Sequence, residues 1–363
     1  MNIPGLTIID RYIIRKFLGT YIFTIVLFIV ISIVFDITEK LDDFLDSHVS
    51  LYTIVFVYYV NFIPYFAILF TPLFLFVAVI FFTSRLASNS EIVAILNSGV
   101  TFNRMLFPYF ISALLITSFN IYANHWLLPA ANKTRIAFEN TYINGEWYTS
   151  GNNIHMQIEK GLFVYMQNYD YADSTGNRFT AEKFVNGNLV YKLKAEKIVW
   201  DFPTRKWKVK NFSVRQIGKM TESISTGKDT LVAYNISPRD FGRKIGEVET
   251  LNARELDDVI DEEKLKGADD IPFYEIEKYK RTAFPFAIFI LTLIGVSLAS
   301  RKVRGGIGLH IGLGITLSFA YILFQQFSTT FSTNGNLPSW MGVWIPNFIF
   351  LIIALFLYRR APK

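Results

Sequence analysis

Long uncharged apolar runs restrict the fold of this chain more than any other feature of its sequence. The first, Phe17 to Phe35, contains about nineteen residues, enough to cross about 30 Å of hydrocarbon as a helix. The second contains Pro64 and Pro72, and we treat it as one kinked span because either break would leave pieces too short to cross twice. The sequence therefore predicts an α-helical polytopic membrane protein with six transmembrane helices. The other five lie at Leu51–Phe82, Leu106–Leu128, Ala283–Ala299, Ile307–Phe327 and Met341–Tyr358.

A polar segment, residues 129–272, separates the first three spans from the last three. Within it, Leu189, Tyr191 and Leu193 alternate with lysines, which is the period of a β-strand with one apolar face. The Asn186-Gly187 pair just before them is a turn signal. This segment therefore predicts strands rather than a further helix.

A second alternating run, Trp207–Lys210, follows the turn-like link Asp201–Thr204, so the two runs predict a hairpin. We expect the insert to be a small all-β domain, sandwich-like or jelly-roll-like. The pattern fits both a filled interior and an open slot lined by residues such as Trp200, Trp207 or Phe163. Further candidate strands lie at Leu162–Met166, Phe179–Val185, Phe212–Gln216 and Leu231–Tyr234.

The predicted organisation has three parts: a membrane half at 1–128, the β insert at 129–272 and a second membrane half at 273–363. Before the first span, Ile8–Lys16 fits a short amphipathic helix in the interface. Lys40 is the only cation in the short loops on one side of the six spans. By the positive-inside rule, both termini are expected in the cytoplasm and the insert outside it. The cations on the other side are Arg11, Arg15, Lys16, Arg85, Arg104, Arg301, Lys302, Arg304, Arg359, Arg360 and Lys363.

Composition and motif content narrow the function. The chain is 52% hydrophobic, with 35 Phe and 19 Tyr, which is too apolar for a soluble protein with a polar insert of this size. It has no cysteine, so disulfides and the commonest zinc motifs are excluded. No nucleotide-binding loop, H-E-x-x-H or G-x-S-x-G motif occurs in the sequence. We expect no catalytic site, metal, cofactor or nucleic-acid partner, and any ATP hydrolysis to reside in a separate chain.

Residues 88–99 form the most informative short segment on the predicted cytoplasmic side. Ser88 and Glu91 have capping-box spacing, and Gly99 suits a helix end. Ile92, Ile95 and Leu96 share one face of the predicted helix. This pattern fits a loop helix resting on the membrane and also a coupling helix that docks in a groove on a cytosolic motor.

Short motifs then occur in a characteristic order: Asp10-Arg11-Tyr12, Ser90–Val93 with Ser98-Gly99, Tyr279–Arg281 with Pro285, Arg301–Gly308, Gly335–Pro338 and Trp344–Asn347. Their order, with three spans, one β insert and three more spans, resembles the LptF/LptG (YjgP/YjgQ-type) permease family over essentially the whole chain. The layout is shared by both members, so it does not distinguish an LptF-like from an LptG-like chain.

The resemblance implies a non-enzymatic permease subunit of an ABC-type lipopolysaccharide exporter in the inner membrane of a Gram-negative bacterium. It implies a heterodimer with a second permease of the family, an LptB-like ATPase dimer that binds the ATP, and an LptC-like protein. The complex would lift lipopolysaccharide from the inner membrane and pass it to a periplasmic β-jellyroll bridge. Glu91 falls where the family's coupling helix meets the ATPase, beside Ile92, Ile95 and Leu96. One departure is the acidic segment 36–43, which leaves Lys40 as its only cation.

Cations near the outer ends of spans one, three and four are candidates for binding lipid A phosphates. The alternative is that they are ordinary interfacial cations that snorkel toward the head groups. Tyr191 and Leu193 are the candidates for contact with acyl chains in the insert. The candidate cations are Lys40, Lys133, Arg135, Lys280 and Arg281.

Two other functions fit parts of the pattern. A lipoprotein-releasing or other ABC-type lipid permease would have four spans and a larger outer domain, so the six predicted spans argue against it. A membrane-anchored β-domain scaffold or sensor would need neither a coupling helix nor a β interior large enough for an amphiphile. Co-purification of an ATPase would distinguish it from an exporter.

Overall fold

The computed structural model describes residues 6–143, 152–170, 173–218, 221–238, 246–266, 271–301, 306–335 and 337–361. The chain forms two compact units, one helical and one built around a β-sheet. The helical unit contains Met1–Ile143, Glu249–Ala253 and Pro272–Lys363, and the β unit contains Asn144–Val248 and Arg254–Ile271. Of the sequence features above, Asn336, Lys363 and residues 302–305 lie outside the described residues.

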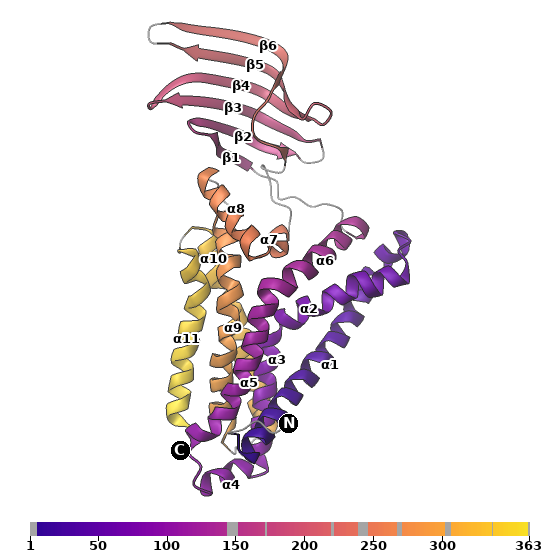
Figure 1. Cartoon of the computed structure of the whole chain (residues 1–363), viewed down its shortest axis with the longest axis vertical. Coiled ribbons are helices and arrows are strands. Elements are labelled where there is room, and N and C mark those ends of the chain that lie inside the picture. Colours follow the sequence, from indigo (N-terminus) through magenta and orange to yellow (C-terminus); the bar gives the residue numbers. More distant parts are fainter. Residues whose placement is uncertain are drawn as a thin grey trace. The chain divides into compact units, whose positions relative to one another are not determined.

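Six helices among the described residues are long and apolar enough to cross a membrane, as predicted (Figure 1). Helices α3 and α4 are separate elements, at Thr71–Ser88 and Glu91–Asn97. The third candidate span combines α5, η2 and α6, so residues 128–142 continue the helix of that span. The helices of the helical unit are α1 Ile8–Asp46, η1 Thr53–Tyr59, α2 Val60–Leu69, α3, α4, α5 Phe102–Tyr122, η2 Ala123–Leu127, α6 Leu128–Tyr142, α9 Ile271–Ala299, α10 Gly306–Thr333 and α11 Ser339–Arg360. The short helix α7, Glu247–Thr250, is divided between the two units, with Glu249 in the helical one.

Helix α1 is one continuous element, so the prediction of a separate interfacial helix at Ile8–Lys16 is wrong. Thr7 and Asp10 form a capping box, in which Asp10 N donates to Thr7 Oγ (3.3 Å) and Thr7 N donates to Asp10 Oδ2 (2.9 Å). This cap satisfies two backbone N–H groups at the N-terminus of α1, and the helix begins at Ile8. With 39 residues, α1 is about 58 Å long and exceeds the hydrocarbon thickness.

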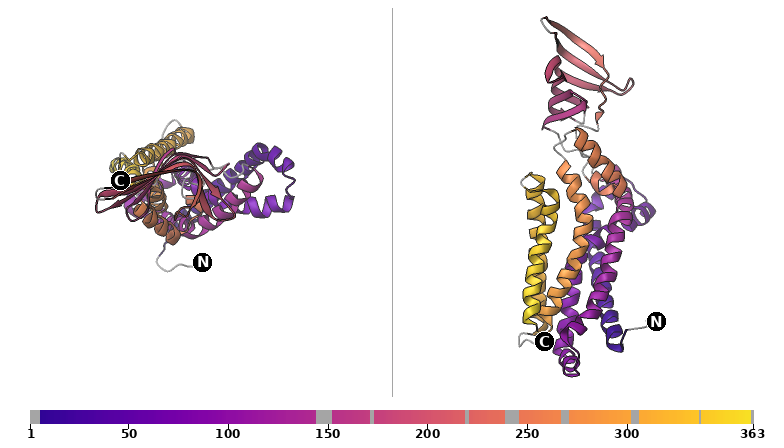
Figure 2. Two further views of the ribbon diagram at one scale, coloured as in Figure 1. Left: turned by 90° about the horizontal axis from the view of Figure 1, so that it is seen from above. Right: turned by 60° about the vertical axis from the view of Figure 1, so that its left-hand side comes forward.

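The long second apolar run contains a break between two helices. Phe70 has φ −96° and ψ 3°, which ends α2, and Pro72 occupies the first turn of α3. Before the break, seven residues form the π-helix η1. The end of α1, η1 and α2 together form an outer arm at one side of the helical unit (Figure 2). The run therefore contributes one candidate span, as predicted, but the predicted bounds Leu51–Phe82 are wrong: the candidate span is Thr71–Ser88, and Thr53–Leu69 forms a separate, shorter apolar helical stretch.

Helix α9 lies at the centre of the helical unit. Ile288, Leu291 and Ile294 are fully or almost fully buried. A Cβ added at Gly295 would come within 2.8 Å of Val79 in α3, so glycine allows these two helices to approach closely. Helices α3, α9, α10 and α11 contribute to one buried cluster, and α1, α3, α4, α5 and α9 to another.

The β unit contains helix α8, Ala253–Lys266, and one antiparallel sheet whose six strands follow chain order. The predicted hairpin is confirmed, with Trp200 opposite Trp207. The two runs Trp207–Lys210 and Phe212–Gln216 belong to a single strand, β5. The strands are β1 Asn152–Glu159, β2 Leu162–Asp170, β3 Thr175–Val185, β4 Asn188–Asp201, β5 Lys206–Ile217 and β6 Glu222–Val232.

Short connections explain why the described strands form one open sheet, and the jelly-roll arrangement is not confirmed. Asn186 and Gly187 have φ 50° and 78°, the two positive φ values of a type I′ turn, and join Val185 to its partner Asn188. The other neighbouring strands are also joined by short links. A jelly roll needs long crossovers to place strands in a second layer.

One face of the sheet is apolar and well packed. Phe179, Ile198 and Trp207 are completely buried. The segment after β6 crosses this face, because Trp207 Nε1 donates to Ile236 O (2.9 Å) and the rings of Phe179 and Tyr234 lie 5.7 Å apart. The centre of the apolar face is therefore filled by the chain itself.

Candidate functional site

Lys40 lies in a partly buried polar cluster at the outer arm. Its Nζ forms an ion pair with Asp36 Oδ1 (2.8 Å), approaches Glu139 Oε1 at 3.5 Å and donates to the hydroxyl of Tyr58. Tyr59 in turn donates to Asp36 Oδ2 (3.0 Å). Lys40 is thus held between two carboxylates and a phenol supplied by α1, η1 and α6.

Arg135 joins the same cluster through Glu139. Its Nη1 donates to both Glu139 carboxylate oxygens, at 3.0 and 3.1 Å, and its Nη2 lies 3.8 Å from Glu249 Oε2. Its Cζ lies 4.2 Å from the centre of the Tyr65 ring, a cation–π geometry. Only 11% of the Arg135 side chain is exposed, so this cation already has its counter-charges inside the helical unit.

Arg281 and Lys280 line a cavity of about 60 Å³ beside this cluster, together with Glu249 and Glu277. Arg281 is almost completely buried, and it donates from Nε to Glu277 Oε1 (3.1 Å) and from Nη1 to the backbone oxygen of Leu251 (2.8 Å). Partial burial, together with repulsion from Glu277, raises the pKa of the Glu249 carboxyl. Within the described part of the chain, no ion pair involves Lys280.

The structure therefore brings together four of the five predicted cations. Lys133 is the exception: it lies on the exposed side of α6. The carboxylates that pair with the cations were missed by the sequence reading, although the spacing contains a signal. Three pairs are four residues apart on one helix, which places opposite charges on the same face. These pairs are Asp36–Lys40, Arg135–Glu139 and Glu277–Arg281.

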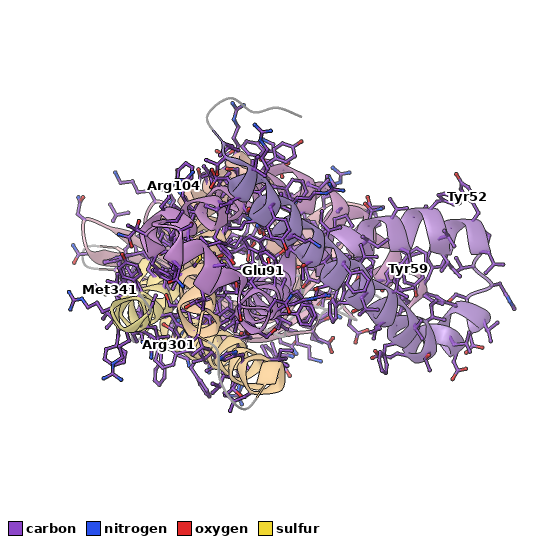
Figure 3. All side chains as sticks on the ribbon, turned by 90° about the horizontal axis from the view of Figure 1, so that it is seen from below. Tyr52, Tyr59, Glu91, Arg104, Arg301 and Met341 are labelled. Carbon is purple, nitrogen blue, oxygen red and sulfur yellow. The ribbon has the colours of Figure 1, made fainter. Side chains whose placement is uncertain are left out.

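Helix α4 lies at the end of the helical unit that carries both chain termini, where Figure 3 shows Glu91. The predicted Ser88 capping box is wrong: the Ser88 hydroxyl donates to Arg85 O (3.0 Å), and α4 begins only after Ser90, whose φ is 62°. The predicted stop at Gly99 is confirmed by its φ of +87°. Glu91 instead accepts hydrogen bonds from Tyr12 Oη (3.0 Å) and Asn89 Nδ2 (3.2 Å).

The predicted apolar face of α4 packs against the helical unit itself. Ile92 is 1% exposed, and Ile95 and Leu96 pack against the same buried cluster. Val93, by contrast, is 49% exposed. The surface that α4 leaves exposed therefore consists of Val93, Ala94 and Asn97, and Glu91 lies partly buried at its edge.

An ion pair that sequence reading missed fixes the start of α1. Arg104 donates to both oxygens of Asp10, from Nη1 at 2.7 Å and from Nη2 at 2.6 Å. Asp10 is 2% exposed, so its charge depends on this two-point contact. The two residues are 94 positions apart, and nothing in their local sequence connects them. Together with the Tyr12–Glu91 hydrogen bond, this pair ties α1 to α5 and α4.

Strand β4 shows the predicted alternation. Leu193 is 1% exposed, and Tyr191 is half-buried against the same apolar cluster. On the other face, Lys192 pairs with Glu182 and Lys194 is exposed. Phe163 does not line this interior, because it is 43% exposed and alternates with the buried Leu162 and Val164. Among the described residues, no group of His, Asp and Glu side chains could hold a metal ion.

Comparison with known proteins gives one family. Residues 11–360, nearly the whole chain, match the family described as lipopolysaccharide export system permease LptF/LptG. No curated protein matches the chain.

We expect Arg135→Gln to lower the free energy of unfolding by about 3 kcal/mol, because removing one partner of a buried ion pair leaves an uncompensated charge. The double variant Arg135→Gln/Glu139→Gln should recover much of this loss. Unfolding of the purified full chain in detergent measures both, with Lys133→Gln as the exposed control on the same helix. Equal stability of the Arg135 and Lys133 variants would contradict a structural role for the pair.

Proposed function

The chain belongs to the LptF/LptG family of lipopolysaccharide export permeases, and from this premise we propose that it extracts lipopolysaccharide from the inner membrane and passes it to a periplasmic β-jellyroll bridge. It is a transmembrane transport subunit of the export system. The observation that carries the finer proposal is the combination of a paired cation cluster, an exposed α4 surface and a β unit with one apolar face.

The proposed partners are a second permease of the family, an LptB-like ATPase dimer and an LptC-like protein. Two candidate spans are only slightly covered by the rest of the chain, which supports a second permease as a partner. In the most apolar windows of α1 and α10, only 6% and 28% of the residues are buried within the chain. A heterodimer would cover part of these faces with a second set of helices.

The proposed orientation places both termini and α4 in the cytoplasm and the β unit in the periplasm. Four arginines lie in the first or last turns of helices at the end with the termini, which supports this orientation by the positive-inside rule: Arg85, Arg104, Arg359 and Arg360. The opposite end carries the acidic stretch of α1, where cations are matched by carboxylates.

We propose that lipid A phosphates bind at the cluster of Lys40, Arg135, Lys280 and Arg281. The ion pairs of Lys40, Arg135 and Arg281 mean that a phosphate must compete with resident carboxylates, whereas Lys280 lines the cavity without such a pair among the described residues. Lys280 is therefore the first contact that we propose, and exposed Lys133 could add attraction from the outer side of α6.

The apolar face of the sheet supports the proposed contact with acyl chains. Burial falls along β4 from Ile198 and Leu193 to half-buried Tyr191, so the open part of the face lies toward the Asn186-Gly187 turn. Each buried methylene contributes about 0.8 kcal/mol, which makes an apolar surface necessary for chains that move through water. A scaffold or sensor would not need this surface to contact lipid.

Reporter fusions test the orientation. We expect a reporter fused after Asn97 to be active only in the cytoplasm and one fused after Lys228 only in the periplasm, because the cations gather at the end with the termini. Activity of either reporter on the opposite side of the membrane would contradict the proposed six-span topology.

Charge reversal tests the coupling role of α4. We expect Glu91→Lys to weaken association with the ATPase by about tenfold and to abolish transport. Insertion should persist, because Glu91 is only partly buried and forms no ion pair with another described residue, although its hydrogen bonds with Tyr12 and Asn89 are lost. Tyr12→Phe is the matched control, since it removes the hydrogen bond to Glu91 and leaves the carboxylate in place. If the control weakens ATPase binding equally, Glu91 acts by holding α1 and not by docking the ATPase.

Photo-crosslinking tests the lipid path. A crosslinking group at Tyr191, on the open part of the apolar face, should capture lipopolysaccharide in an ATP-dependent way, and so should one at Leu193 if the segment that covers it moves aside during transport. Groups at Lys192 or Lys194 on the polar face should not. The experiment uses the complete exporter during turnover. Equal capture from both faces, or none from Tyr191, would make the β unit a docking module and not a lipid path.

A further inference from the structure

A cavity of about 200 Å³ lies between the first turns of α1 and the last turns of α3. Its lining includes Lys16 and Thr20 from α1, Phe82 and Arg85 from α3, and Glu91 from α4. It belongs to the end of the helical unit that carries the termini, and the cation cluster around Lys40 contributes nothing to its lining. The cavity has room for a phosphate group together with the first atoms attached to it.

Two cations of this cavity lack an internal counter-charge. Lys16 and Arg85 are exposed, and neither forms an ion pair with a carboxylate of the described residues. Nearby Arg104 differs, because Asp10 binds it at two points. Glu91 is the one carboxylate of the lining, and its oxygens accept hydrogen bonds from Tyr12 and Asn89. The lining therefore keeps an excess of one positive charge, which favours an anion.

The same cavity has an apolar side. Phe82 and Leu86 are nearly buried and form a fixed wall, whereas Phe81 is 38% exposed at the rim. Further along α1, Phe23 and Leu27 are 69% and 51% exposed. A ligand with an anionic group in the cavity could lay a hydrocarbon chain on these residues.

We propose that this cavity binds the phosphate head group of an anionic phospholipid from the leaflet at this end of the helices, with its acyl chains along α1. Basic pockets next to membrane helices bind such head groups through charge and hydrogen bonds. A soluble phosphate compound shares the phosphate chemistry, but the exposed apolar rim and the apolar surface of α1 favour the lipid. This site is separate from the lipopolysaccharide path proposed above.

The test measures lipid binding to the purified full chain by native mass spectrometry. Short-chain phosphatidylglycerol is the probe, short-chain phosphatidylcholine tests the need for net charge, and glycerol 1-phosphate tests the need for acyl chains. Lys16→Gln and Arg85→Gln should each weaken phosphatidylglycerol binding about fivefold, which corresponds to about 1 kcal/mol per cation. Arg15→Gln is the matched control: Arg15 is an exposed cation next to Lys16 that does not line the cavity. Lys16→Arg should retain binding.

The outcomes separate the alternatives. Loss in the two cavity variants, with retention in Arg15→Gln and Lys16→Arg, supports the site. Equal binding of phosphatidylcholine, or unchanged binding in the cavity variants, overturns it. Glycerol 1-phosphate that binds as tightly as phosphatidylglycerol would assign the cavity to a soluble phosphate. Weaker ATPase binding with unchanged lipid binding would assign Lys16 and Arg85 to the protein interface instead.

Discussion

The need to pair charges inside a helical membrane unit shapes both ends of this protein. At one end, Asp10 is buried and takes two hydrogen bonds from Arg104. At the other, Lys40 and Arg135 share Glu139. A charge left alone in such surroundings would be costly, so each of these contacts holds together the helices that supply its partners. The outer arm and the start of α1 both depend on this rule.

The sequence predicted the elements that depend on local pattern. Apolar length located six spans, and the Asn186-Gly187 turn and the alternation around Leu193 located a hairpin and its faces. The sequence did not show which of Pro64 and Pro72 marks the break between α2 and α3. A proline can lie inside a helix, as Pro64 does, or in the first turn of one, as Pro72 does. The alternation of apolar and polar residues predicts strands, but it does not predict how the strands are connected. The number of sheet layers in the β unit was therefore not predicted.

The candidate site was predicted less completely, because a cation read alone does not identify its partner. Lys40, Arg135 and Arg281 were candidates for binding phosphate, and each forms an ion pair with a carboxylate four residues away. The spacing was visible in the sequence, whereas the contacts of Glu139 with both Lys40 and Arg135 require the fold. The apolar face of α4 was ambiguous for a similar reason. Its sequence pattern does not reveal whether Ile92 packs against another protein or, as the structure shows, against the core of the same chain.

The continuity of α1 has a mechanical consequence. A single helix of 39 residues connects the end held by Arg104 and Glu91 with the end that holds Asp36 and Lys40. If the first end acts as a pivot, a tilt of about 10° moves the far end by about 10 Å, given a length of about 58 Å. Helix α1 can therefore act as a lever, in which a small rotation beside α4 becomes a displacement large enough to separate Lys40 from Glu139. A break at residue 16 or 35 would have removed this amplification.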